Sequence, residues 1–234
     1  MATGIIPAIG RPGIGSAVTA QRRGVFRDAM FGAFAGGGTI EGSLSRDPGN
    51  SAHSVYSLRP GLLMGKITSG GYWAPSIIGV TQAAYTSGGT SLTLTAAQAA
   101  YLVARVGASG TFNLIGPASA AGSNNTTQVT YSGVNTTTGV VTITNIGANR
   151  IAGCLVAPED GSQTPRTLIP DGHNVLIDDV GLGDVSFPRI PVSGVVDVDN
   201  IIDWPSDTTL KTFVRESLST LSGGKFVFSD QFEA

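Results

Sequence analysis

The stretch RPGLLMGKITSGGYWAP at residues 59–75 has the pattern of a β-hairpin, and the expected fold is built outward from it. An apolar run at 62–67 and the aromatic pair Tyr72-Trp73 flank a Ser-Gly-Gly turn. Two β-prone runs around a glycine turn are a strong local hairpin signal. A β-sheet domain is therefore expected to begin in this part of the chain.

The last third of the chain continues the β pattern. NRIAGCLVAPEDGS at 149–162 is an apolar strand that ends in an acidic turn. PVSGVVDVDNIIDWPSD at 191–207 is also β-like, and a period of two would put Asp197 and Asp199 on one side of the pleat. These segments are expected to complete the sheet that the hairpin starts.

One helix is predicted near the C-terminus, in SDTTLKTFVRESLSTLSGG at 206–224. Ser206 or Asp207 is the expected N-cap, and Gly223 ends the helix. A single apolar stripe should face the core: Leu210, Phe213, Val214, Leu218 and Leu221. A short alternating strand, KFVFSDQF, follows it.

Residues 81–148 have a character of their own. TAAQAAYLVARV allows one helix with Thr95 as its N-cap, and GTFNLIG reads as a short strand. QVTYSGV and GVVTITNIG alternate apolar and polar residues around a turn, which predicts an antiparallel hairpin with one solvated face. This segment is interpreted as an inserted β-rich module.

Residues 1–50 are interpreted as an extended N-terminal arm. Gly-rich and Pro-rich stretches leave little room for regular elements, although 21–34 could form a short amphipathic helix. The expected organisation is therefore an arm at 1–50, a β domain made of 51–80 and 149–234, and the module at 81–148.

Composition favours a component of a large assembly. Charged residues make up 13% of the chain, against about 25% in typical domains, whereas 41% is hydrophobic and the net charge is −2. Residues 1–60 hold six arginines and three acids, 61–150 hold no acid, and 151–234 hold thirteen acids and five bases. This scatter argues against direct nucleic-acid binding. The acid-free middle suggests surface buried between subunits of a closed oligomer.

No membrane segment or signal peptide is expected, because no apolar run reaches the roughly 18 residues that span a bilayer.

The sequence also offers few candidates for catalytic or metal-binding residues. Cys154 lies in an apolar run and is expected to be inert, and His53 and His173 stand far apart. Two acidic groups could bind a cation but are interpreted as solvated surface acids: Asp178, Asp179 and Asp184, and Asp197 with Asp199. We therefore expect no enzyme, no cofactor and no metal site.

RPGLLMGKITSGGYWAP and NRIAGCLVAPEDGS together resemble the phage head decoration family typified by the lambda capsid D protein. GTFNLIGPASAAG and VTYSGVNTTTGVVTITNIG resemble a small β module inserted in other phage capsid-associated proteins. The resemblance covers roughly half of the chain, which is about twice the length of the short decoration proteins. The arm and the insertion depart from the family's compact form.

The resemblance implies a mainly β protein with minor α content: a decoration-protein-like β domain with an inserted small β module, one C-terminal helix and an extended arm. It also implies a capsid decoration (cement) protein on the outer surface of a phage virion, a homotrimer whose partner is the major capsid protein. The alternative is another virion structural protein, namely a major capsid, tail or spike component.

Candidate partner contacts follow from the arm and from the hairpin. The arm's isoleucines would fill small pockets while its arginines face acids, and strand addition to a sheet edge would supply main-chain hydrogen bonds. The hairpin offers its aromatic end as a second contact. The candidate residues are Ile5, Ile6, Ile9, Ile14, Arg22, Arg23, Arg27, Tyr72, Trp73 and Pro75.

Overall fold

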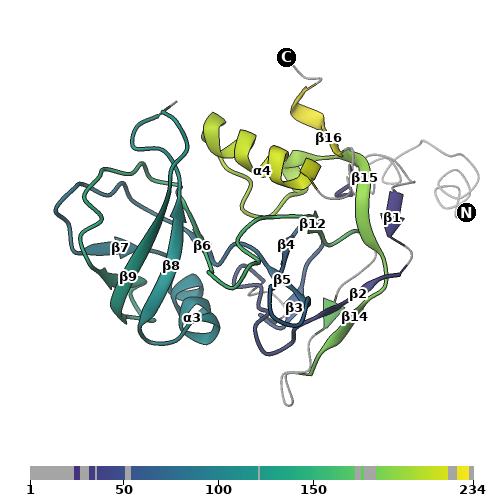
Figure 1. Cartoon of the computed structure of the whole chain (residues 1–234), viewed down its shortest axis with the longest axis horizontal. Helices are drawn as coiled ribbons and strands as arrows, with labels where there is room; N and C mark the ends of the chain where they lie inside the picture. The colour runs from purple at the N-terminus through teal and green to yellow at the C-terminus, as the bar shows by residue number, and fades with distance from the viewer. Residues whose placement is uncertain are drawn as a thin grey trace, which may run out of the picture.

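The computed structural model describes residues 24–26, 32–34, 36–50, 54–120, 122–171, 175–176, 183–220 and 226–231. The fold is mainly β, as expected, and two α-helices lie in these residues. Figure 1 shows two lobes side by side. We call residues 79–157 the curled lobe and the remaining described residues the body.

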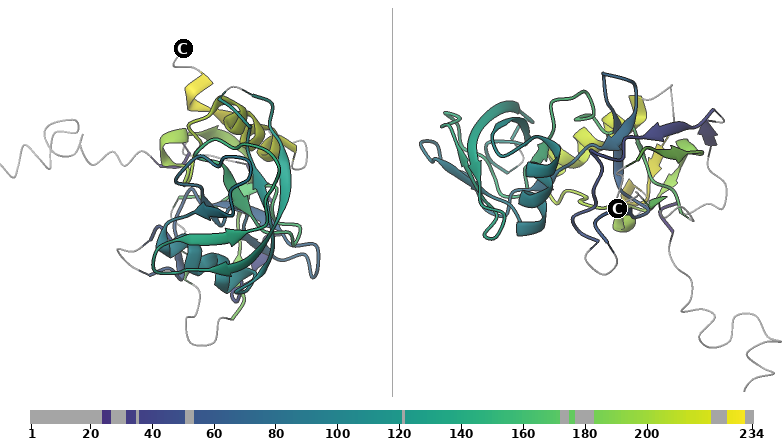
Figure 2. Two further views of the ribbon diagram at one scale, coloured as in Figure 1. Left: turned by 90° about the vertical axis from the view of Figure 1, so that its left-hand side faces the viewer. Right: turned by 90° about the horizontal axis from the view of Figure 1, so that it is seen from below.

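The curled lobe is one six-stranded sheet in the order β6-β11-β8-β9-β10-β7. Its elements are β6 (Gly79–Val80), β7 (Ser91–Thr93), α3 (Ala96–Arg105), β8 (Gly110–Ile115), β9 (Thr126–Val134), β10 (Val140–Ile143) and β11 (Leu155–Ala157). The sheet curls back on itself, because the amide of Gln82, just after β6, donates to the carbonyl of Thr93 in β7 at 2.8 Å. Figure 2 shows this curl from two further directions.

Local sequence signals explain the elements of this lobe. Thr95 caps α3 in a reciprocal capping box with Gln98, as predicted for its N-terminus. β9 and β10 pair antiparallel, and Val129 and Tyr131 are buried while Thr130 between them is exposed. The predicted hairpin with one solvated face is therefore confirmed. The sheet also takes in strands that lie just outside the expected 81–148 segment.

The body is built on the predicted hairpin, in which β4 (Leu63–Lys66) and β5 (Trp73–Pro75) pair antiparallel. They lie within a five-stranded sheet, β12-β4-β5-β2-β14. The other members are β2 (Gly38–Ile40), β12 (Thr167–Leu168) and β14 (Val185–Phe187). A second sheet has the order β1-β15-β16, made of β1 (Gly32–Phe34), β15 (Ile190–Val196) and β16 (Phe226–Phe228). A small pair joins β3 (Ser57–Leu58) to β13 (Val175–Leu176).

The predicted C-terminal helix is α4 (Thr208–Thr220). Asp207 caps it, because its carboxylate accepts from the amides of Thr209 and Leu210 at 2.9 and 3.2 Å. Leu210, Val214 and Leu218 of the expected stripe are fully buried, Phe213 is partly buried, and Leu221 lies outside the described residues.

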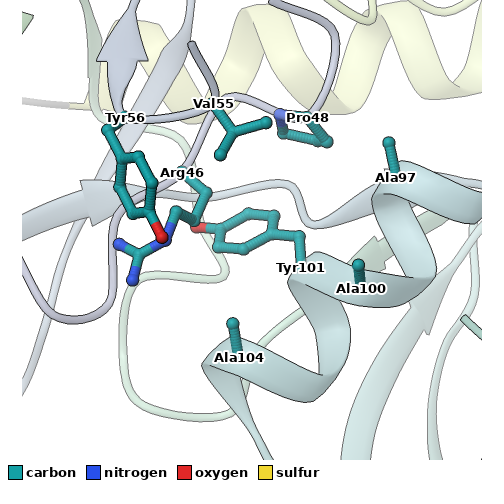
Figure 3. Close-up of a pocket in the computed structure, with 8 residues that line it drawn as sticks. All are labelled: Arg46, Pro48, Val55, Tyr56, Ala97, Ala100, Tyr101 and Ala104. Atoms are coloured by element: carbon teal, nitrogen blue, oxygen red, sulfur yellow. The ribbon is translucent and has the colours of Figure 1, made fainter. Parts of the chain in front are cut away.

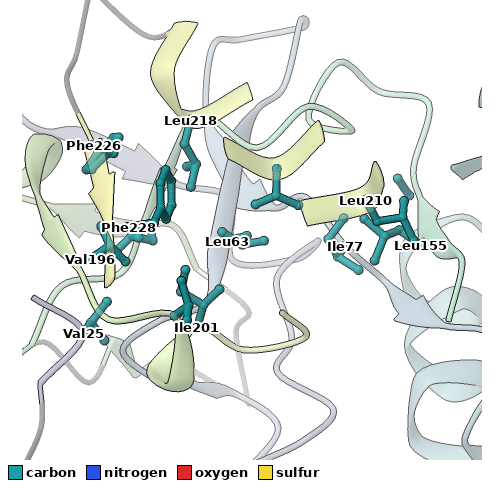
Figure 4. Packing of buried hydrophobic residues seen from close by; sticks show 14 of the residues in the cluster. Val25, Leu63, Ile77, Leu155, Val196, Ile201, Leu210, Leu218, Phe226 and Phe228 are labelled. Atoms are coloured by element: carbon teal, nitrogen blue, oxygen red, sulfur yellow. The ribbon is translucent and has the colours of Figure 1, made fainter. Parts of the chain in front are cut away.

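One hydrophobic cluster joins the two lobes. Figure 4 shows side chains of α4 against Leu63, Ile77 and Leu155, with the phenylalanines of β16 nearby. Ile115 and Leu155 of the curled lobe belong to the same cluster as Leu63 of the body. A shared core of this kind holds two packed units in a fixed arrangement.

The interpretation of 1–50 as one extended arm is wrong for its second half. Gly32–Phe34 is a strand rather than the end of a helix, and Gly38–Ile40 pairs with both β5 and β14. Ile40 is fully buried in the core of the body, in the same hydrophobic cluster as Trp73 and Phe187. Residues 1–23 and 27–31 lie outside the described residues.

The placement of Asp197 and Asp199 on one strand is also wrong. β15 ends at Val196, and a 3-10 helix follows at Val198–Asn200. Asp197 is buried and accepts a hydrogen bond from the Ser229 hydroxyl at 3.2 Å, whereas Asp199 is exposed. Asp197 is therefore a structural acid of the core and not a solvated surface acid.

We predict that Ile40→Ala lowers the free energy of unfolding by about 2–5 kcal/mol, because it opens a cavity in a packed core. Urea denaturation measures the change. Thr39→Ala, on the more exposed side of the same strand, serves as the control and should cost less than about 1 kcal/mol. An unchanged urea midpoint for Ile40→Ala would show that residues 38–40 do not pack in the core. It would support the interpretation of these residues as part of an extended arm.

Candidate interaction surfaces

The three hairpin residues that were expected to contact a partner differ in their exposure to solvent. Tyr72 is 37% exposed, whereas Trp73 is 6% exposed and Pro75 is buried. Trp73 packs edge-to-face against Phe187, with ring centroids 6.2 Å apart. Trp73 and Pro75 were wrong as partner contacts, because β5 is an interior strand between β4 and β2. The expected arm contacts Ile5, Ile6, Ile9, Ile14, Arg22, Arg23 and Arg27 lie outside the described residues.

The turn of the hairpin is the exposed part of this region. Gly70 and Gly71 have φ of 80° and 72°, a left-handed conformation that other residues adopt only with strain. Together with the exposed Thr68 and Ser69 they place the Tyr72 ring at the surface. Of the three hairpin residues predicted to contact a partner, Tyr72 is therefore the exposed one.

The acidic turn after β11 packs directly on this hairpin. The amide of Thr68 donates to the carbonyl of Asp160 at 2.8 Å. A side chain at Gly65 would put its Cβ 1.9 Å from the carbonyl oxygen of Ser162, so only glycine fits there. The hairpin and the turn thus form one continuous surface feature.

A buried arginine connects the two lobes at this point. The Arg105 side chain, at the end of α3, is fully buried and donates through Nε and Nη2 to Asp160 Oδ2 at 3.1 and 2.8 Å. Its Nη2 also reaches the hydroxyl of Ser162 at 2.8 Å, and its Nη1 donates to the carbonyl of Leu44. We call this set of bonds the Arg105 junction.

The junction sets the protonation of its members. Burial alone would raise the pKa of Asp160, but the charge of Arg105 and the hydrogen bonds from Ser162 outweigh it and lower that pKa below its ordinary value. The hydroxyl of Tyr101 donates to the Leu44 carbonyl at 3.0 Å, and burial raises its pKa. At neutral pH the junction therefore holds a charged guanidinium–carboxylate pair and a neutral tyrosine.

A small pocket lies beside the junction (Figure 3). It has a volume of about 210 Å³ and is bounded on one side by Ala97, Ala100 and Ala104 of α3. On the other side the Arg46 guanidinium lies 4.5 Å from the centre of the Tyr56 ring. Arg46 Nη1 already donates to the carbonyls of Gly42 and Ser45, so this cation has a structural role.

The described residues hold little that could perform chemistry. They contain no group of three or more His, Cys, Asp or Glu side chains placed to hold a metal ion. Cys154 is buried, and burial raises the pKa of its thiol to about 11. His53, His173, Asp178 and Asp179 lie outside the described residues, and Asp184 accepts a hydrogen bond from the Gly42 amide at 3.2 Å.

No helix in the described part of the chain is long and apolar enough to cross a membrane.

No family model, curated protein or solved structure matches the chain. Fold and site geometry define it as a mainly β protein of two lobes that share a core.

We predict that Arg105→Ala destabilises the protein by about 2–4 kcal/mol, because it leaves the Asp160 carboxylate and the Leu44 carbonyl without their main donor. Chemical denaturation gives the change directly. Arg166→Ala removes an exposed arginine of the body and should stay within about 0.5 kcal/mol of the wild type. Equal effects of the two variants would contradict a structural role for the junction.

The lowered pKa of Asp160 predicts a pH dependence. An aspartate whose pKa is lower in the folded state adds stability above its unfolded value of about 3.9, and that stability is lost as pH falls through the folded value. The stability difference between wild type and Asp160→Asn should therefore shrink as pH falls from about 5 to about 3. Urea unfolding at a series of pH values tests this, and a constant difference would refute it.

Proposed function

We propose that this protein is a capsid decoration protein, which binds the outer surface of a bacteriophage head and stabilises the shell without catalysis. One observation carries the proposal. The two segments that carry the family resemblance, 59–75 and 149–162, are far apart in sequence yet pack against each other through Thr68, Asp160 and Gly65. They form one structural unit, which is what a shared ancestral domain interrupted by an insertion would retain.

The capsid contact in this proposal consists of residues 1–23 and the exposed Tyr72. The root of the arm is well anchored, since Val25 and Phe26 are 2% and 6% exposed. The Phe26 amide donates to Asp171 at 3.1 Å, and Asn200 donates to the Gly24 carbonyl at 3.1 Å. A segment attached at such a root can transmit load to the body when its other end is bound.

The mechanism is mechanical. Each copy binds the major capsid protein weakly, and a trimer placed at a local three-fold point engages several subunits at once. Avidity then exceeds single-site affinity by about 10²–10⁴. The shell is thereby held together against the pressure of the packaged DNA.

We predict that a variant lacking residues 1–23 keeps the wild-type melting transition but binds undecorated heads at least about tenfold more weakly. Pelleting with purified heads measures the binding. Tyr72→Ala tests the second contact, and Phe34→Ala, which removes a 59% exposed side chain of β1, is the control for loss of an exposed aromatic ring.

The outcomes separate the candidate functions. Full binding by the truncated variant would exclude residues 1–23 as a capsid contact and leave Tyr72 as the candidate contact. Failure of the intact protein to bind any head would overturn the decoration function. Spontaneous assembly of the purified chain into shells would favour a major capsid protein instead.

A further inference from the structure

The pocket beside the Arg105 junction has an apolar wall on the side of the curled lobe. Ala97, Ala100 and Ala104 line it from one side of α3, since they follow each other at the spacing of a helix face. All three alanines are exposed. The helix therefore borders the pocket with methyl groups that other atoms do not cover.

The other wall comes from the body. Pro48, Val55 and Tyr56 line it, and Figure 3 shows them with the alanines around the Tyr101 ring. The volume of about 210 Å³ exceeds the roughly 150 Å³ of an apolar cavity that holds benzene. The space therefore suits one aromatic ring or a short branched chain.

Arg46 supplies a cation to this pocket, although the residue is only 8% exposed. Its Nη1 is occupied by two carbonyls, whereas Nε and Nη2 donate to no atom of the described residues. Arg59 and Arg105 each hold a carboxylate through this same Nε–Nη2 edge. In Arg46 the edge that elsewhere in this protein binds a carboxylate is open.

No carboxylate of the described residues serves Arg46 as a counter-charge. Asp47 follows it in the chain, but Asp47 is fully buried and gives both oxygens to Arg59. Arg46 takes part in none of the ion pairs among the described residues. Buried charges in proteins are normally paired, because an uncompensated one is costly. A carboxylate that enters the pocket supplies the missing counter-charge.

The potential at the pocket wall is positive for a second reason. Burial raises the pKa of Tyr101, and the charges of Arg105 and Arg46 both oppose that shift. Both cations therefore act on this wall, and the pocket lining contains no acid. An anion gains from such a field, and the partly desolvated setting strengthens the interaction.

We propose that this pocket binds a small organic acid. Its carboxylate accepts hydrogen bonds from Nε and Nη2 of Arg46, and its apolar body, one ring or a short branched chain, packs against the alanines of α3. The inference does not depend on the proposed decoration function. Because the two walls belong to different lobes, a bound acid adds contacts across the lobe boundary and raises the melting temperature.

Benzoate is the probe, and benzamide is its neutral counterpart of nearly the same shape. Isothermal titration calorimetry at neutral pH should give a Kd for benzoate of about 1 mM or tighter. Benzamide should bind at least about tenfold more weakly, because it cannot form the charge-assisted pair with Arg46.

Variants locate the binding in the pocket. Ala100→Leu fills the space at an exposed helix position where leucine is well tolerated, and it should weaken benzoate binding at least about tenfold. Ala96→Leu is the control, because Ala96 is exposed on the same helix but does not line the pocket. Arg46→Lys keeps the charge but loses the planar edge, and should also bind at least about tenfold more weakly. Circular dichroism checks the fold, and Ala100→Leu decides the test if Arg46→Lys does not fold.

A second probe identifies the source of the carboxylate. N-acetylphenylalanine carries the terminal carboxylate of a polypeptide beside an aromatic ring. Binding at least about tenfold tighter than that of benzoate would assign the pocket to the C-terminal end of a partner chain, and equal or weaker binding would assign it to a free acid.

Three results would each overturn the site. They are no saturable binding of benzoate up to about 20 mM, equal affinity for benzamide, and unchanged binding by Ala100→Leu. The head-pelleting assay does not involve this pocket, so failure of the decoration function would leave the acid site standing.

Discussion

The docking of the two lobes depends on a buried cation, Arg105, that has no carboxylate partner in its own lobe. Arg105 ends α3 inside a segment that contains no carboxylate between Ile67 and Pro158. Arg150, the other buried arginine of this lobe, donates to the Asn149 carbonyl and the Thr127 hydroxyl within the lobe. Arg105 instead pairs with a carboxylate outside the lobe, and removing that partner would leave a buried charge uncompensated. Asp160 and the Leu44 carbonyl of the body are its acceptors, and the hydrophobic cluster around Leu155 closes beside them. The Arg105 junction and this cluster together hold the curled lobe against the body.

Local signals in the sequence were sufficient for much of the secondary structure. The Thr95 capping box, the alternation in β9 and β10 and the Asp207 cap each involve residues a few positions apart, and the structure has all three. Long-range pairing could not be predicted. β2 runs parallel to β5 through one residue pair, and β15 runs parallel to β16 through three residue pairs. The local pattern of apolar and polar residues does not show which distant strand will pair with a given strand.

Glycine was the main source of error. The Gly-rich stretch before residue 40 reads as an open arm, yet a Cβ at Gly38 would lie 2.6 Å from Nε1 of Trp73. Glycine there reflects close packing and not lack of structure. The same hidden strand buries Trp73 and leaves Tyr72 as the exposed member of the aromatic pair. Arg105 carried no recognisable signal of its role, although the acid-free run around it was visible in the composition.

A protein with a charge-free outer lobe and a body that carries the exposed charges suits a position in a dense surface array. In the proposed decoration role, the body is the part that binds the head, and the lobe tolerates close neighbours because it does not repel them. Electron cryomicroscopy of undecorated phage heads after incubation with the purified protein is the direct test of decoration. Decoration predicts ordered density of this two-lobed shape at symmetry-related positions on the outside of the shell. Bare heads, or density only inside the shell, would contradict it.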